Sequence, residues 1–254
     1  MMKRELQIDR LAIRVYDNAE EMSTDAAKLA GDYLRSRISR QRRARIIWAT
    51  GSSQIRFLEG LMTLQDIEWD KVTSFHLDEY LGISREHPAS FRRYLRDRLA
   101  RKVSFAHFHY LEGDSEQPVA ECDRYTRLLQ AGAIDLCCLG VGENGHLAFN
   151  DPGVAEFNDP YWVKLVKLDA KNRQQQCDRG YFPALDKVPA YAFTLTLPAI
   201  SAAQKLFCLV PGQQKAVIVK QMLEGAIDSN CPASWLRDRA NAILFLDRES
   251  ASLL

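Results

Sequence analysis

The stretch Leu139-Gly-Val-Gly-Glu-Asn-Gly-His-Leu-Ala-Phe-Asn-Asp-Pro152 follows an apolar run, Ile134–Leu139, that has the length and composition of a buried strand. Glycines at positions 140, 142 and 145 tolerate positive φ angles and close backbone approach, so they predict a sharp turn after that strand. In an open α/β sheet, ligands bind where a strand ends in a glycine-rich polar loop. The stretch therefore predicts where the site of an α/β protein would lie.

Strand-like segments alternate with amphipathic helices along the whole chain. The predicted strands cover residues 11–16, 46–49, 72–75, 105–111, 134–139, 163–168, 191–197, 205–210 and 242–246. The predicted helices cover residues 20–40, 55–62, 91–99, 116–130, 169–179 and 213–223, with Asn18 and Ser90 as candidate caps. This alternation predicts one α/β domain, residues 1–254, with a mostly parallel central sheet and helices on both faces. The least regular segment, about 154–189, is predicted to form a lid over the site.

Composition narrows the classes of partner. The 254 residues are 46% hydrophobic and 26% charged, as in an ordinary soluble globular protein. A formal net charge of +1 argues against nucleic acid or an anionic membrane as partner, and no apolar run is long enough to span a bilayer. The charged N-terminus lacks a secretory apolar segment, so we expect a cytoplasmic location.

The cysteines indicate packing rather than chemistry. They stand at positions 122, 137, 138, 177, 208 and 231, and none has the C-x-x-C spacing of a zinc or redox motif. Cys137, Cys138 and Cys208 fall in predicted core strands, where a free thiol behaves as a small apolar side chain. We therefore predict core packing for all six and no metal site.

Two polar features attract attention as acid/base groups. His146 carries the one side chain of the opening loop whose ordinary pKa permits proton transfer in either direction near neutrality. Asp78 and Glu79 are adjacent carboxylates just after the strand 72–75, and strand alternation would send them to opposite sides. A solvated turn is the alternative interpretation of this pair.

Two further features suit an anion. The turn Thr50-Gly-Ser-Ser-Gln54 joins a predicted strand to a helix and can offer backbone N–H groups and hydroxyls. Lys215 stands in the first turn of a predicted helix, where its charge opposes the helix dipole unless an anion binds there. The alternatives are a simple small-residue turn and a solvated lysine.

Several stretches together resemble the glucosamine-6-phosphate deaminase (isomerase) family in order and spacing. They are Ala49–Ser53, Phe75–Tyr80 with His87-Pro88 beyond, Gly142-x-Asn-Gly-His-x-Ala-Phe-Asn-x-Pro152, Val188–Ala192 and Pro211–Lys215. The sister family, 6-phosphogluconolactonase, shares the fold, but its loop typically has an Asp-Gly-His-Thr-like pattern without the Phe-Asn present here. The resemblance implies a Rossmann-like, NagB-type fold. It also implies an enzyme, expected to be a hydrolase acting on an amino-sugar phosphate. This enzyme would convert glucosamine 6-phosphate and water to fructose 6-phosphate and ammonia without metal or organic cofactor.

The resemblance also implies roles for individual residues. His146 would open the sugar ring, with Asp151 at the position of the carboxylate that orients it and Asn144 at a second ring-opening position. Asp78 would move the proton between C2 and C1, supported by Glu79, which is also expected to bind substrate. The residues implied to bind the phosphate are Gly51, Ser52, Ser53 and Lys215, together with a lid arginine, either Arg173 or Arg179.

Three departures from the family pattern leave alternatives open. Asp151 replaces the usual Glu before Pro, so its reach to His146 is one methylene shorter. The lid carries an unusual run of glutamines, 174–176, and the chain ends soon after its last strand, so we do not carry over hexamer formation or allosteric control. A homo-oligomer stays open. A galactosamine-6-phosphate deaminase, a 6-phosphogluconolactonase-like hydrolase and a non-catalytic sugar-phosphate sensor are the competing hypotheses.

Overall fold

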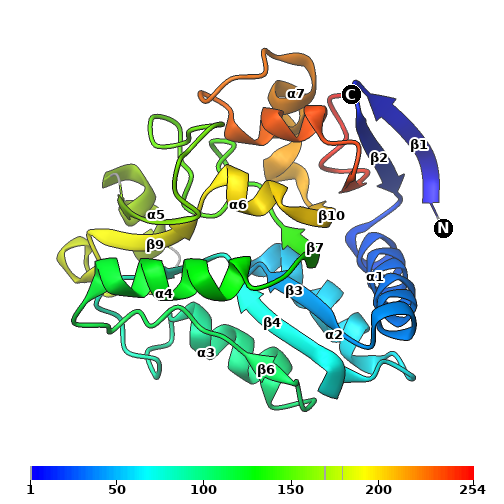
Figure 1. Cartoon of the computed structure of the whole chain (residues 1–254). Coiled ribbons are helices and arrows are strands. Elements are labelled where there is room, and N and C mark those ends of the chain that lie inside the picture. The colour runs from blue at the N-terminus through cyan, green and yellow to red at the C-terminus, as the bar shows by residue number, and fades with distance from the viewer. Residues whose placement is uncertain (1, 169, 179) are drawn as a thin grey trace.

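The fold is built on an eight-stranded sheet with the strand order β1-β2-β11-β10-β7-β3-β4-β6. It is seen in a computed structural model that describes residues 2–168, 170–178 and 180–254 (Figure 1). Neighbouring strands run parallel except β1, which is antiparallel to β2. The strands are β1 (Met2–Ile8), β2 (Leu11–Tyr16), β3 (Ala44–Trp48), β4 (Val72–His76), β6 (His107–Phe108), β7 (Ile134–Leu139), β10 (Ala203–Val210) and β11 (Ala242–Asp247). The predicted, mostly parallel central sheet is confirmed.

Helices cover both faces of this sheet. In Figure 1, α1 (Ala19–Gln41) and α2 (Ile55–Thr63) lie on one side, and α4 (Pro118–Gln130) and α6 (Leu197–Ser201) lie on the other. The remaining helices are α3 (Phe91–Leu95), which continues as a π-helical turn over Arg96–Ala100, α5 (Ala170–Asp178) and α7 (Ala216–Glu224). Short 3₁₀ turns cover Ser52–Gln54, Trp69–Lys71, Leu185–Lys187, Gln213–Lys215 and Pro232–Asp238. None of the helices in the described ranges is both long and apolar enough to cross a bilayer.

The predicted helix caps are found. The side chain of Asn18 accepts a hydrogen bond from the backbone N–H of Glu21 at 2.9 Å and begins α1. Ser90 begins α3 by accepting from the backbone N–H of Arg93 at 3.4 Å. Each cap satisfies a backbone donor that a helix leaves unpaired in its first turn.

Five of the six cysteines are buried as predicted, and the sixth is only half-buried. Cys137, Cys138 and Cys208 are fully buried in adjacent strands of the central sheet, and Cys122 and Cys231 are also buried. Burial raises the pKa of these thiols, which keeps them protonated. Cys177, in α5, is only half-buried.

The order of the strands fixes the position of the site. β3 and β7 are neighbours, but the next central strand in sequence is β4 after β3 and β10 after β7, and these two lie in opposite directions along the sheet. Loops that diverge in this way leave a crevice at the carboxyl ends of the two strands. Gln54, in the turn after β3, links this turn to the end of β7, because its Nε2 donates to the carbonyl oxygen of Leu139 at 3.1 Å. The two loops are therefore held close together.

A second, antiparallel sheet was not predicted. It has the order β5-β9-β8, formed by β5 (Asp78–Tyr80), β9 (Tyr191–Leu195) and β8 (Val163–Lys167). We expected residues 78–80 to be loop and the other two strands to join the central sheet. Residues 78–80 form a segment too short to show the alternation of polar and apolar side chains that predicts a strand. For β8 and β9 the alternation predicts a strand, but it does not indicate which strand is the partner. The strand β1 was missed because its sequence is charged.

The segment predicted as a lid, 154–189, contains β8 and α5 and packs on a small second core. Tyr80 is the centre of that core, with its ring centroid 5.3 Å from that of Phe149 and 5.7 Å from that of Phe182. The imidazole of His87 stacks on Phe182 at 5.1 Å. The segment is therefore anchored by aromatic contacts to the strand that carries Asp78; whether it moves stays a prediction.

Strand β9 ties the opening loop to the strand of Asp78. Thr194 lies opposite Asp78 in the β5–β9 pair, and its Oγ1 accepts a hydrogen bond from the backbone N–H of Phe149 at 3.1 Å. Asn150 donates from Nδ2 to the carbonyl oxygens of Leu147 and Leu195, both at 2.8 Å. Both side chains are fully buried, so these bonds are shielded from water.

We expect Thr194→Val to lower the free energy of unfolding by about 1–3 kcal/mol, because it leaves the buried N–H of Phe149 without its acceptor. Urea denaturation measures this change. Thr73→Val, at a half-buried position of β4, is the matched control and should change stability much less. Equal effects of the two substitutions would show that the Thr194 hydroxyl does not hold the loop.

Candidate active site

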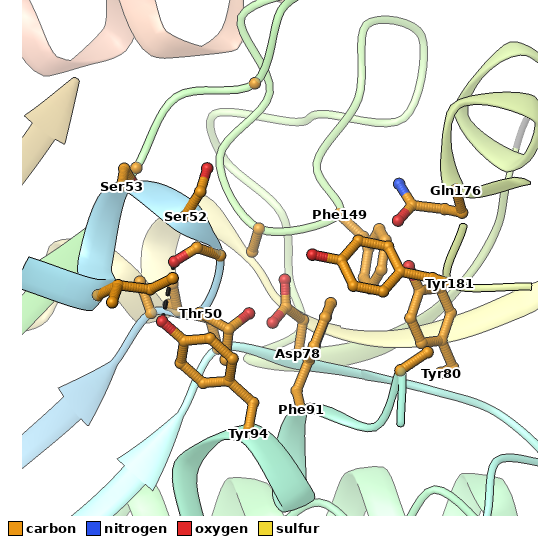
Figure 2. A pocket seen from close by; sticks show the side chains of 18 of the residues that line it. Thr50, Ser52, Ser53, Asp78, Tyr80, Phe91, Tyr94, Phe149, Gln176 and Tyr181 are labelled. Carbon is orange, nitrogen blue, oxygen red and sulfur yellow. Dashed lines mark hydrogen bonds between the residues drawn. The ribbon is translucent and has the colours of Figure 1, made fainter. Parts of the chain in front are cut away.

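One large cavity opens at the carboxyl ends of the central strands. Its volume is about 780 Å³, within the usual range for small-molecule sites. Figure 2 shows Ser52 and Ser53 toward one end, Asp78 in the middle, and Gln176 and Tyr181 toward the other end. The residues that line it include Thr50, Gly51, Ser52, Ser53, Asp78, Tyr80, Tyr94, Arg98, Glu143, His146, Phe149, Gln176, Tyr181 and Lys215. His146 and Asp78 thus face one cavity, although 68 positions separate them in the chain.

The opening loop holds a three-residue hydrogen-bond network. His146 Nδ1 lies 2.7 Å from Asn144 Oδ1 and 3.1 Å from Asp151 Oδ1, and Asn144 Nδ2 donates to Asp151 Oδ1 at 2.8 Å. Both oxygens that face Nδ1 are acceptors, so Nδ1 carries the hydrogen and Nε2 is left to accept a proton. Asp151 is buried, and the shorter carboxylate reaches the histidine.

Two glycines of this loop serve different purposes. Gly145 has φ 86°, in the left-handed region that favours glycine. Gly142 lies directly against the imidazole, because a Cβ placed there would be 2.2 Å from Cε1 of His146. The backbone N–H of Gly142 also donates to the carbonyl oxygen of His146 at 2.9 Å. The missing side chain at position 142 therefore provides the space for the histidine ring.

Asp78 opens into the cavity as a buried carboxyl. It begins β5, is 8% exposed, and directs its carboxyl group into the hollow seen in Figure 2. Burial raises the pKa of Asp78 well above its ordinary value, and the charge of neighbouring Glu79 raises it further. A carboxyl with a raised pKa is a stronger base once ionised, as general-base catalysis near neutral pH requires.

A buried histidine positions the backbone of Asp78. His76 Nε2 accepts from the backbone N–H of Leu111 at 2.9 Å, so Nδ1 carries the hydrogen and donates to the carbonyl oxygen of Asp78 at 2.9 Å. Burial lowers the pKa of His76 to about 3, which keeps the ring neutral. His76 lies outside the cavity, so it acts through Asp78 and not on a ligand.

The structure corrects the expectation that Glu79 binds substrate. Glu79 is fully buried and does not line the cavity, because strand alternation turns it away from Asp78. Its carboxylate accepts from the backbone N–H groups of Tyr80 (3.0 Å), Phe91 (3.1 Å) and Arg92 (2.9 Å), and from the hydroxyl of Ser90 (2.7 Å). These bonds fix the start of α3. Glu79 is therefore a positioning residue.

The predicted anion-binding corner is assembled from two separate βα turns. Gly51 has φ 97° and Gly212 has φ 95°, and each begins a 3₁₀ turn that leads into a helix. Ser52 and Ser53 from the first turn and Lys215 from the second line the same cavity. Lys215 Nζ donates to the carbonyl oxygen of Val141 at 2.8 Å, which holds the ammonium over the crevice between β3 and β7.

Of the two predicted lid arginines, only Arg173 lies within the described residues. Arg173 donates to the carbonyl oxygens of Leu185 at 2.7 Å and Val188 at 2.8 Å, and it does not line the cavity. Its contact with substrate stays a prediction. Its guanidinium holds the lid backbone together. Arg179 lies outside the described residues. From the same segment, Gln176 and Tyr181 reach the cavity instead.

Sequence reasoning missed the contribution of α3. Tyr94 and Arg98 line the cavity from this helix and its π-helical extension, and Tyr94 OH donates to the carbonyl oxygen of Gly51 at 2.8 Å. Their i, i+4 spacing places both on one helix face, which is the signal that the sequence offered. Among the described residues, no group of three or more His, Cys, Asp or Glu side chains is placed to hold a metal ion.

Comparisons with known proteins give the class to which this fold and site belong. The family profile described as glucosamine-6-phosphate isomerases/6-phosphogluconolactonase matches residues 17–245. A glucosamine-6-phosphate deaminase from Exiguobacterium sp. is 35% identical over 231 residues, which cover 91% of this chain and 88% of that protein. This chain belongs to the glucosamine-6-phosphate isomerase/6-phosphogluconolactonase family.

Solved structures agree with this assignment. A structure described as a monomeric glucosamine-6-phosphate deaminase, a missing link of the NagB superfamily, superposes with a TM-score of 0.87 at 31% identity, covering 95% of this chain and 99% of that one. The 6-phosphogluconolactonase from Thermotoga maritima superposes with a TM-score of 0.76 at 18% identity, covering 93% of this chain and 99% of that one. The second likeness shows the shared fold alone.

We expect Gly142→Ala to displace the imidazole of His146 and to reduce turnover by roughly a hundredfold, as a catalytic group moved by about 1 Å does. Steady-state kinetics on the substrate proposed below measures this loss. Gly60→Ala in α2 is the matched control, because a Cβ there would meet Ala27 Cβ at an ordinary 3.4 Å. Wild-type turnover in Gly142→Ala would contradict the close contact.

We expect Glu79→Gln to extend activity toward lower pH. Asp78 acts as a base only when ionised, so its raised pKa places the acid limb of kcat/KM above that of an ordinary aspartate. Removing the charge of Glu79 removes one cause of that raised pKa, and the limb should move down. The control is Glu86→Gln, which removes an exposed carboxylate paired with Arg96 and should leave the limb in place. An upward shift in Glu79→Gln would contradict this assignment.

Proposed function

We propose that this protein is an aldose–ketose isomerising deaminase that converts glucosamine 6-phosphate and water to fructose 6-phosphate and ammonia. The observation that carries the proposal is the shared cavity: the His146 network and the Asp78 carboxyl face one space that also holds a lysine and two serines at one end. The deaminases among its relatives support the choice of substrate.

Ring opening needs one group that takes a proton and returns it. In the proposed mechanism, Nε2 of His146 accepts the proton of the 1-hydroxyl and delivers it to the ring oxygen, which opens the hemiacetal to the aldehyde. Asp151 and Asn144 hold the hydrogen on Nδ1 and stabilise the imidazolium that forms between the two transfers.

Isomerisation needs a base on the face of the open chain. Asp78 removes the proton from C2 and returns it at C1, so that the aminoaldehyde becomes the 2-imine of fructose 6-phosphate. Water then adds to C2, and ammonia leaves as the carbonyl forms. The raised pKa of Asp78 suits this step, because a carboxyl of ordinary pKa is a weak base toward a C–H bond.

The phosphate is assigned to the corner of Gly51, Ser52, Ser53 and Lys215. Backbone N–H groups at the start of a helix, hydroxyls and an ammonium together suit a dianion. Anchoring the phosphate there leaves the sugar to extend toward Asp78 and His146, since all these residues line one cavity. This assignment of roles is part of the proposal.

The geometry of the site supports the competing hypotheses less well than it supports deamination. Lactone hydrolysis needs His146 as base and leaves the buried Asp78 without a role. A sensor without activity was suggested by the shorter Asp151, but its carboxylate reaches His146 at 3.1 Å. The relatives are named deaminases and isomerases, so our classification of the reaction as a hydrolysis is not supported. The galacto substrate, a homo-oligomer and the cytoplasmic location stay predictions.

We expect the purified protein to release equal amounts of ammonia and fructose 6-phosphate from glucosamine 6-phosphate, and Asp78→Asn to abolish both. Coupled enzymatic assays measure the two products, with galactosamine 6-phosphate and 6-phosphogluconolactone tested side by side. Turnover of the lactone alone would replace the proposed reaction.

The stability of Asp78→Asn serves as the control for folding. The folded-state pKa of Asp78 lies above its unfolded value, so its stabilising contribution is present at low pH and is lost as pH rises through the folded pKa. At neutral or higher pH the uncharged Asn should therefore maintain or raise Tm, by about 2–4 °C for each kcal/mol. Lost turnover with an unchanged or higher Tm identifies a missing base; lost turnover with a much lower Tm identifies unfolding.

A further inference from the structure

Two arginines, Arg93 and Arg98, line the cavity, and Arg93 is held by the carbonyl oxygen of Glu86 at 2.7 Å and by Asp97 at 3.6 Å. The role of Arg98 is not yet explained. Arg98 lines the cavity from the π-helical extension of α3, and its guanidinium carbon lies 4.1 Å from the centre of the Tyr94 ring. Tyr94 in turn donates its hydroxyl hydrogen to the carbonyl oxygen of Gly51 at 2.8 Å. Figure 2 shows Tyr94 on the same side of the cavity as Thr50, Ser52 and Ser53. Arg98 thus stacks on an aromatic ring whose hydroxyl is hydrogen-bonded to the anion-binding turn.

Arg98 differs from the other arginines of this helix. Arg92, Arg96 and Arg101 are held by carboxylates, at 2.6 Å from Glu112, 2.6 Å from Glu86 and 2.8 Å from Asp97 respectively. Within the described residues, Arg98 stacks on Tyr94 and makes no hydrogen bond or ion pair. Its guanidinium therefore keeps its donors available for a ligand in the cavity.

The nearest acidic neighbour in sequence does not neutralise this charge. Asp97 also lines the cavity, but its carboxylate is shared among Arg93 (3.6 Å), Arg96 (3.5 Å) and Arg101 (2.8 Å). Meanwhile Arg173, which we expected to contact the phosphate, donates to backbone carbonyls of the lid. Among the described residues, Lys215 thus supplies one cation to the anion-binding corner. Arg98 is placed to supply a second one, whose planar guanidinium can donate two hydrogen bonds to one phosphate.

We propose that Arg98, oriented by Tyr94, is a phosphate-binding residue of this cavity and supplies the bidentate contact expected of a lid arginine. The inference rests on the proposed function for the identity of the sugar, but its chemistry requires only a phosphate. A planar guanidinium matches two phosphate oxygens, and stacking on an aromatic ring orients it before the ligand arrives.

The test compares Arg98→Met with Arg101→Met, a matched loss of charge at the C-cap of the same π-helical turn, at a residue that does not line the cavity. Calorimetry measures the binding of fructose 6-phosphate, unphosphorylated fructose and inorganic phosphate. Arg98→Met should weaken fructose 6-phosphate and inorganic phosphate by roughly ten- to a hundredfold, the range for charge-assisted hydrogen bonds, and Arg101→Met should bind as wild type does. Arg98→Lys keeps the charge without the fork and should fall between them.

Kinetics separates binding from chemistry. For glucosamine 6-phosphate, Arg98→Met should raise KM by the same factor as it weakens fructose 6-phosphate, with kcat within about twofold, as loss of uniform binding does. Equal affinity for phosphate in Arg98→Met and Arg101→Met would overturn the inference, and so would a wild-type protein that binds no phosphate probe. If circular dichroism shows that Arg98→Met does not fold, Arg98→Lys and Tyr94→Leu decide together. Wild-type phosphate binding in both variants overturns the inference, and weaker phosphate binding in Arg98→Lys supports it.

The two proposals fail in distinguishable ways. Absence of deamination by a wild-type protein whose phosphate binding depends on Arg98 would remove the proposed reaction and keep the phosphate site. Normal deamination by Arg98→Met with unchanged KM would remove the role of Arg98 and keep the reaction.

Discussion

The site depends on β9, because this strand fixes two segments that the central sheet leaves apart. Asp78 follows β4 and the His146 loop follows β7, and β3 stands between those two strands. β9 pairs with the strand of Asp78, and the hydroxyl of Thr194 accepts a hydrogen bond from the loop at Phe149. Asn150 adds a bond from the loop to the carbonyl oxygen of Leu195. The separation of base and imidazole is therefore set by buried hydrogen bonds and not by the central sheet alone.

The same arrangement buries a carboxyl group at the position where the proposed reaction needs a base. Asp78 and Glu79 are adjacent buried carboxyls, and strand alternation gives them different surroundings. Burial raises the pKa of both carboxyls, but Glu79 accepts four hydrogen bonds at the start of α3 that partly offset this effect, whereas the neighbouring charge raises the pKa of Asp78 further. The two carboxyls therefore have different roles. Glu79 holds the start of α3 in place, and Asp78 becomes a stronger base in the cavity.

Sequence patterns predicted the elements better than their partners. The run at 134–139 and the glycine loop after it identified β7 and the site, because a buried parallel strand is continuous in hydrophobicity and its loop is rich in glycine. They could not predict that residues 163–167 and 191–195 leave the central sheet, since strand pairing is a tertiary property. Position and residue type identified Asp78, His146 and Lys215, which share the cavity. They did not indicate that Glu79 and Arg173 lie outside the cavity, because the hydrogen bonds of these side chains to backbone groups are visible only in three dimensions.

The cysteines have a practical consequence. Five of the six thiols are buried, and burial raises their pKa, so they present little thiolate to solvent. Cys177 is half-buried and belongs to α5, beside the cavity-lining Gln176. A maleimide dye added under mild conditions would therefore label one chosen place, the helix at the rim of the cavity. The native sequence thus already provides a single attachment point for a fluorophore that follows this helix during a reaction cycle, without engineered cysteines.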